Sequence, residues 1–149
     1  MPIEADIKQE KFNNEFEKAA VNILFTGGWL YNINSTRLKR FDVTPEQYNV
    51  LRILRGRHPE TMMLAEITSR MIDKSSNATR LVEKLRQKGF ANREICENNR
   101  RQVDISITDK GLSVSKKIQT ASHACISTLK NISKADAQEL NRILDKLRS

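Results

Sequence analysis

The sequence predicts a mainly α-helical chain of the α+β class, with one β-hairpin set between helices. Apolar residues recur with helical spacing over most of its length, and the spacing changes to strict alternation after Phe90. The 149 residues suit one domain of ordinary size, and no internal repeat or Pro/Gly-rich linker divides them. We therefore expect a single domain over residues 1–149.

The N-terminal segment predicts one long amphipathic helix. Apolar side chains recur at helical spacing from residue 12 to about residue 38. Gly27 and Gly28 lie inside this run, and each is about 1 kcal/mol less favourable than Ala in a helix interior. We therefore expect a bend or close packing at the glycine pair.

Two shorter helices follow. In "VTPEQYNVLRIL", Thr44 has the position of an N-cap, Pro45 that of the first helical residue, and Gln47 closes a capping box. This helix is expected to end near Gly56. After a loop, the apolar run over residues 64–71 predicts a short helix.

Residues 74–89 predict a third helix of this series, with two distinct faces. Its apolar face follows the i, i+3, i+4, i+7 pattern and consists of Ala78, Leu81, Val82 and Leu85. The opposite face is expected to carry Ser76, Asn77, Arg80, Glu83 and Lys84. Gly89 then has the position of a helix C-cap.

A hairpin and two further helices complete the predicted fold. The segments "FANREI" and "QVDISIT" flank "CENNRR", and the second alternates apolar with polar residues. This pattern predicts a two-stranded hairpin with one buried face. "TDKG" begins another helix, and Ser133 with Asp136 caps a last one.

The order of three helices and a hairpin is that of a winged helix-turn-helix lobe, here over about residues 44–107. A helix that enters the major groove of DNA needs short hydrogen-bonding side chains near its N-terminus and cations within reach of phosphate. The third helix offers both. The residues concerned are Lys74, Ser75, Ser76, Asn77, Thr79, Arg80 and Lys84.

The charge distribution indicates the same region. The net charge of +8, from 26 Lys and Arg against 18 Asp and Glu, favours a polyanionic partner, with nucleic acid first and an anionic membrane surface second. Residues 70–101 hold nine basic and four acidic residues, so +5 of that excess lies there. Arg100 and Arg101 at the hairpin tip suit a minor groove, whose negative potential attracts arginine.

The segment "SSNATRLVEKLRQKGFANREICENNRRQVDISITDKG" resembles the recognition helix, wing and following helix start of the MarR family of bacterial transcription regulators. A weaker likeness extends through "VTPEQYNVLRIL" and the flanking helices. The resemblance implies a homodimer whose N- and C-terminal helices, about residues 8–40 and 108–149, interlock. It also implies two lobes that straddle a palindromic operator, usually as a repressor.

Carried over position by position, the resemblance also assigns contacts to individual residues. Those implied to meet the major groove and phosphates are Ser75, Ser76, Asn77, Thr79 and Arg80. Arg101 matches the family's wing-tip arginine. The family's wing usually has an Asp two residues before that arginine, and this chain has Asn99. A neutral amide still hydrogen-bonds, so Asn99 is itself a candidate DNA contact, but it orients Arg101 less firmly than an ion pair does.

Three aromatic residues are candidates for contact with a small-molecule effector. Members of the family often bind small aromatic compounds near the dimer and DNA-binding lobes, which brings Trp29, Tyr31 and Tyr48 into consideration. Packing in the core or at a dimer interface is the alternative, and the sequence favours it. A small aromatic effector is therefore an expectation that depends on the family resemblance.

The sequence contains no motif of a catalytic, metal or cofactor site. It has no nucleophile–base pair and no Gly-rich phosphate loop, and His58 and His123 lack neighbours at ligand spacing. Cys96 and Cys125, without CxxC spacing, indicate free thiols in a reducing cytoplasm. The charged N-terminus predicts no export signal, and the longest uncharged run is too polar for a membrane span.

Two alternatives to DNA remain open at this point. A winged-helix lobe with a basic surface also fits an acidic partner protein, and more distantly the shape of an RNA. Steep salt dependence does not separate these partners, because any polyanion produces it. Dependence of binding on DNA sequence does separate them.

Overall fold

The chain folds into a helical lobe with a small sheet, joined to one long helix, in a computed structural model that describes residues 2–99, 102–121, 129 and 131–149. The elements are α1 (Ile3–Ile7), α2 (Glu15–Leu38), η1 (Lys39–Phe41), α3 (Pro45–Arg57), β1 (Met62–Met63), α4 (Leu64–Arg70), α5 (Ala78–Gln87), β2 (Ala91–Ile95), β3 (Val103–Ile107), α6 (Asp109–Ala121) and α8 (Lys134–Leu147). This composition confirms the predicted mainly helical α+β class.

Two predicted capping boxes are confirmed. At the start of α3, the Thr44 hydroxyl accepts a hydrogen bond from the Gln47 amide at 3.2 Å, and the Gln47 side-chain oxygen accepts from the Thr44 amide at 3.2 Å. Ser133 and Asp136 make the same reciprocal pair at the start of α8. Each box satisfies backbone N–H groups that a helix start otherwise leaves without a partner.

The long helix differs from its prediction in two respects. α2 begins at Glu15, because Asn14 caps it by accepting from the Glu17 amide at 2.9 Å, and the separate helix α1 precedes it. α2 continues through Gly27 and Gly28, and a Cβ at either position would have no neighbour within 4 Å, so no other described part of this chain packs closely there. Within the described ranges, no helix combines the length and apolar character needed to cross a membrane.

The sheet has three antiparallel strands in the order β1-β3-β2. β2 and β3 form the predicted hairpin, with Ala91 opposite Ile107 and Arg93 opposite Ile105. β1, which the sequence did not predict, pairs with the other edge of β3 and sets Met62 opposite Ile105. The sheet thereby ties the start of α4 to the hairpin.

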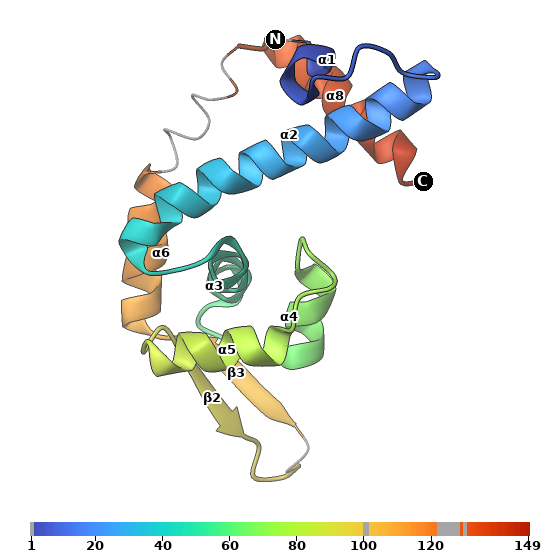
Figure 1. Ribbon diagram of the computed structural model, residues 1–149. Helices are drawn as coiled ribbons and strands as arrows, with labels where there is room; N and C mark the ends of the chain where they lie inside the picture. Colours follow the sequence, from blue (N-terminus) through green and yellow to red (C-terminus); the bar gives the residue numbers. More distant parts are fainter. Residues whose placement is uncertain (1, 100–101, 122–128, 130) are drawn as a thin grey trace.

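The core lies inside the lobe formed by α3, α4, α5, α6 and the sheet. Its buried side chains include Val50, Leu51, Leu54, Ile67, Val82, Leu85, Ile105 and Ile118. Figure 1 shows α2 extending away from this lobe, with both chain termini at the end opposite the hairpin. The lobe therefore presents α5 and the hairpin together at one end of the molecule.

Candidate nucleic-acid interface

The turn that precedes α5 holds the first of the predicted contact residues. α5 begins at Ala78, so Ser75 and Ser76 lie before the helix, and the expected helical placement of Ser76 and Asn77 is wrong. The Ser75 hydroxyl and amide donate to the Asp73 carboxylate at 2.6 and 2.9 Å, and these bonds lower the pKa of Asp73. The Lys74 ammonium donates to the Ser69 carbonyl. An Asx turn thus replaces the first predicted helical turn.

Asn77 is the N-cap of α5. Its side-chain oxygen accepts from the Arg80 amide at 3.0 Å, which satisfies one of the free N–H groups at the helix start. The oxygen is therefore engaged within the protein. The side-chain NH₂ of this exposed residue is the group left to donate to a partner molecule.

The two faces of α5 separate as predicted from Ala78 onward. Ala78, Val82 and Leu85 are buried in the core and Leu81 is half-buried, while Thr79, Arg80 and Lys84 are exposed. Four predicted contact residues come together in a hollow of about 370 Å³ between α5 and the first turn of α3. They are Ser76, Asn77, Arg80 and Lys84.

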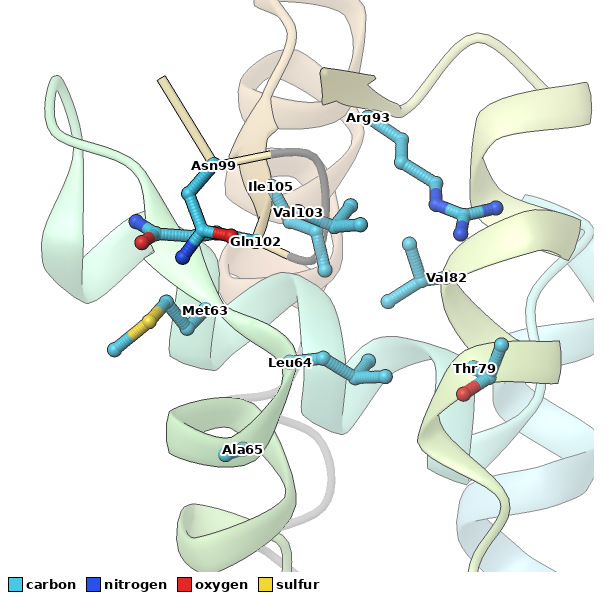
Figure 2. A pocket seen from close by; sticks show the side chains of 10 residues that line it. All are labelled: Met63, Leu64, Ala65, Thr79, Val82, Arg93, Asn99, Gln102, Val103 and Ile105. Carbon is cyan, nitrogen blue, oxygen red and sulfur yellow. The ribbon is translucent and has the colours of Figure 1, made fainter. Parts of the chain in front are cut away.

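On its other side, α5 faces the hairpin across a second hollow, of about 360 Å³ (Figure 2). Thr79 and Asn99, both predicted contact residues, line this hollow together with Arg93. The Asn99 amide donates to the Cys96 carbonyl at 3.2 Å, and its own carbonyl accepts from the Gln102 amide at 2.8 Å. Asn99 therefore helps to hold together the two sides of the loop between β2 and β3.

Arg93 is a candidate contact residue that the sequence reasoning did not single out. It is exposed, and in Figure 2 its side chain extends from β2 toward α5. Its cross-strand partner is the buried Ile105, so it shares the sheet face that is turned toward α5. Every second residue of a strand lies on the same face of the sheet, so the sequence already places Arg93 on one face with Ala91 and Ile95.

Two other basic residues near the end of α5 have partners inside the protein. Arg86 donates to the Glu83 carboxylate at 2.8 and 3.0 Å, and this pairing lowers the pKa of Glu83. The Lys88 ammonium donates to the Asp42 carbonyl and lies 3.4 Å from the Gln47 side-chain oxygen. The Lys88 charge is therefore engaged by other parts of the protein. Arg100 and Arg101 lie outside the described residues.

The MarR family model matches residues 43–103, from the residue before the cap of α3 to the first residue of β3. Over this segment the chain is similar to the MarR family. The matched segment contains α3, α4, α5 and β2, the elements that carry or support both hollows.

Two transcription regulators are similar in sequence. Transcriptional repressor MprA of Escherichia coli K12 is 24% identical over 113 residues, which are 75% of this chain and 64% of MprA. HTH-type transcriptional regulator MgrA of Staphylococcus aureus is 26% identical over 109 residues, which are 73% of this chain and 72% of MgrA. The chain thus spans less than two thirds of the length of MprA.

Two solved structures share the fold. A MarR transcription factor from Planctomyces limnophilus is 28% identical, with a TM-score of 0.71 over 91% of this chain and 98% of that one. The Staphylococcus aureus MepR–DNA complex is 17% identical, with a TM-score of 0.77 over 92% of this chain and 97% of that one. Both confirm the winged-helix architecture.

The three aromatic effector candidates occupy different places. Tyr48 lines a hollow of about 380 Å³ between α2, α3 and α6. Trp29 lines a separate hollow between α1 and α2, and the Tyr31 hydroxyl donates to Glu46. The structure therefore does not gather the three in one cavity within its described part.

The described ranges contain no group of three or more His, Cys, Asp or Glu side chains that could hold a metal ion. Cys96 is a half-buried free thiol in the hairpin. His123 and Cys125 lie outside the described residues. The chemistry assembled at the hairpin end is that of hydrogen bonding and positive charge.

Proposed function

We propose that the chain is a sequence-specific, double-stranded DNA-binding transcriptional regulator that acts in the cytoplasm as a homodimeric repressor on a palindromic operator. The observation that carries this proposal is the grouping of Asn77, Arg80 and Lys84 in one hollow at the N-terminal half of α5. The hairpin lies beside the same helix, as a wing does in DNA-binding lobes of this type.

The proposed docking places α5 in the major groove with its N-terminal half toward the bases. The Asn77 NH₂ group and the Arg80 guanidinium supply donors for base edges and phosphates, and Lys84 reaches phosphate. Thr79 and Arg93 line the second hollow, between α5 and the hairpin. Arg100 and Arg101 at the wing tip are proposed to enter the adjacent minor groove. The MepR–DNA complex, a structure of the same fold, supports DNA as the partner.

Uncovered apolar surface on α2 and α8 supports the homodimer. On α2, Phe16 is 87% exposed and Leu24 is 76% exposed. On α8, no residue is buried, and the apolar face formed by Leu140, Ile143 and Leu147 is open to solvent. Surface of this kind on elements outside a folded core is typical of an interface. A second copy, related by a two-fold axis, covers both helices and presents two α5 helices to successive half-sites.

The hollow lined by Tyr48 supports a small acidic effector. It lies between the long helix and the DNA-binding lobe, and three arginines, Arg37, Arg52 and Arg55, line it. In Arg37, Nη2 donates to Asn34 at 3.2 Å, but Nε and Nη1 are buried with no hydrogen-bond partner among the described residues. Buried guanidinium N–H groups favour a carboxylate partner. We infer that an aromatic carboxylate binds there and releases the protein from DNA.

The test of DNA binding is selection of bound sequences from a random pool of double-stranded DNA, followed by titration of the winner at physiological salt. A palindromic consensus supports the homodimeric regulator. Arg80→Ala is expected to weaken consensus binding and relax base preference, whereas Arg101→Ala weakens binding with less change of preference. No enrichment of any sequence would instead favour a module that binds an acidic protein.

The test of the effector site is thermal unfolding with benzoate and with its neutral analogue benzamide. Benzoate is expected to raise the unfolding temperature of the wild-type protein, since it binds only the folded state. Arg37→Met should abolish that increase, and benzamide should produce none in either protein. Equal effects of the two compounds would contradict recognition of a carboxylate.

A further inference from the structure

Lys88 sits at the C-terminal end of α5, away from the residues proposed to read DNA. It is the C-cap of the helix, and its side chain is 25% exposed. Its ammonium donates to the Asp42 carbonyl, lies 3.3 Å from the Asp42 carboxylate and 3.4 Å from the Gln47 side-chain oxygen. The ammonium thus makes two hydrogen bonds and one ion pair with this segment of the protein.

The segment that receives Lys88 is the junction between the long helix and the DNA-binding lobe. Asp42 ends η1 in the left-handed conformation, with φ of 55°, where the chain turns from α2 into α3. Gln47 is 7% exposed, and the oxygen that faces Lys88 is the one that caps α3 through the Thr44 amide. A change in the angle between α2 and α3 therefore displaces the oxygens that hold Lys88.

The same end of α5 is also attached to the hairpin side of the lobe. Gly89, with φ of +75°, ends the helix, and its carbonyl accepts from the Thr108 hydroxyl at 2.6 Å. The Lys110 ammonium donates to the Lys88 carbonyl at 3.0 Å. These bonds fix α5 relative to β3 and α6. The Lys88 side chain adds a directional contact toward α2 and α3, where apolar packing alone is non-directional.

We propose that Lys88 is a positioning residue for operator recognition. It fixes the position of α5 relative to the junction at residues 42–47. The proposal rests on the proposed function, because it concerns how the DNA-reading helix is held. Lys88 acts through the protein and makes no phosphate contact. Loss of the Lys88 side chain leaves the basic residues that face DNA in place. It lets α5 shift, so that the two recognition helices of the dimer no longer match the spacing of the two half-sites.

The closing experiment compares Lys88→Met with Lys84→Met, a lysine on the same helix that lines the proposed DNA-facing hollow. Affinity for the selected operator and for random DNA is measured over a range of salt concentrations. For Lys88→Met we expect operator affinity to fall about tenfold, while random-DNA affinity stays within about twofold and the salt slope is unchanged. For Lys84→Met we expect both affinities to fall and the slope to decrease by about 0.9.

Hydrogen exchange of the DNA-free protein is the second measurement. Lys88→Met should accelerate exchange of the amides at the start of α3 and the end of α5, whereas Lys84→Met should not. Lys88→Gln, whose shorter polar side chain also loses the contact, gives the same test where Lys88→Met does not fold. The salt slope and the ratio of operator to random-DNA affinity distinguish positioning from a general loss of stability.

Either of two results would overturn the proposal: a reduced salt slope for Lys88→Met, which identifies a phosphate contact, or unchanged operator affinity. If the wild-type protein itself shows no DNA sequence preference, the proposed function fails and the role in recognition fails with it. The exchange data, which need no DNA, then still show whether Lys88 holds α5 to the junction, so the two failures are distinguishable.

Discussion

The Tyr31 hydroxyl donates a 2.8 Å hydrogen bond to the Glu46 carboxylate and so joins the long helix α2 to the first turn of α3. The hydrogen bond to Glu46, together with burial, raises the pKa of Tyr31 above its ordinary value of 10.0. A neutral phenol can donate to a carboxylate, whereas a phenolate repels it. Tyr31 therefore has a structural role at the boundary between α2 and the DNA-binding lobe.

Replacement of Tyr31 by Phe should cost a small amount of stability at neutral pH. The ring and its packing remain, but one charge-assisted hydrogen bond is lost at a site where Tyr31 is 47% exposed. We expect a loss of about 0.5 kcal/mol in the free energy of unfolding, because solvent competes for such a bond. Denaturant unfolding of the two proteins at pH 7 measures this difference.

The same difference should disappear in alkaline solution. Because the pKa of Tyr31 is raised in the folded state, its contribution is complete below the unfolded pKa of 10.0 and is lost as the pH rises through the folded pKa. Wild type and Tyr31→Phe should therefore converge in stability above that point. A stability gap that stays constant through the tyrosine titration would contradict the donor role of the hydroxyl.

Two substitutions at Asn77 should separate folding from DNA binding. Asn77→Ala removes the cap of α5, and we expect a loss of about 1 kcal/mol in stability. Asn77→Asp keeps a cap acceptor at the positive end of the helix dipole, so stability should change by less than about 0.5 kcal/mol. The new carboxylate would face DNA phosphates, and operator affinity should fall at least about tenfold.

The contrast between the two Asn77 variants is read from chemical denaturation and from DNA titration at one salt concentration. Asn77→Asp is the informative variant, since it retains the fold and changes the charge of the surface. Operator affinity equal to that of the wild type would place DNA away from this end of α5.

At Gly111, α6 comes close to Phe90, the residue before β2. A Cβ at this position would lie 2.1 Å from the Phe90 carbonyl oxygen and 2.8 Å from a side-chain carbon of Ile107. Because the nearer atom belongs to the backbone, Gly111→Ala should cost about 3 kcal/mol or more. Equilibrium unfolding in denaturant measures the loss.

Gly56 provides the matched control for Gly111. It lies inside α3, and a Cβ there would have no neighbour within 4 Å. Ala has the higher helix propensity, so Gly56→Ala should stabilise the protein by about 0.5–1 kcal/mol. Opposite signs for the two substitutions are the expected outcome, and equal effects would mean that α6 does not approach Phe90 this closely.

The parts of the fold that the sequence predicted are those set by residues close together in the chain. The capping pair Thr44 and Gln47 lies within a single turn, and the apolar face of α5 repeats every three or four residues. β1 was not predicted, because it has only two residues and is defined as a strand by its pairing with β3. The start of α5 was placed too early because the Asp73–Ser75 turn and the Asn77 cap compete with helical backbone bonds.

In the candidate site, too, the sequence predicts what residues close together in the chain determine, and not what distant residues determine. Arg80 and Lys84 are recognisable from helical spacing alone, and the structure sets them in one hollow. The partners of Lys88 lie 46 and 41 residues away in the sequence, so no local pattern shows that its charge turns inward. Arg93 was passed over for a related reason, since its neighbours across the hollow come from α4 and α5.

The proposed dimer makes a prediction at Leu24, which is 76% exposed on α2. Leu24→Glu would place a carboxylate in an apolar interface, where burial of an unpaired charge is unfavourable, and the dimer dissociation constant should rise at least about 100-fold. Ile95, 64% exposed on the hairpin, is the control, since Ile95→Glu lies outside α2 and α8 and should leave dimerisation unchanged. Sedimentation equilibrium at micromolar concentration distinguishes the two. A Leu24→Glu protein that remains as firmly dimeric as the wild type would exclude this part of α2 from the interface.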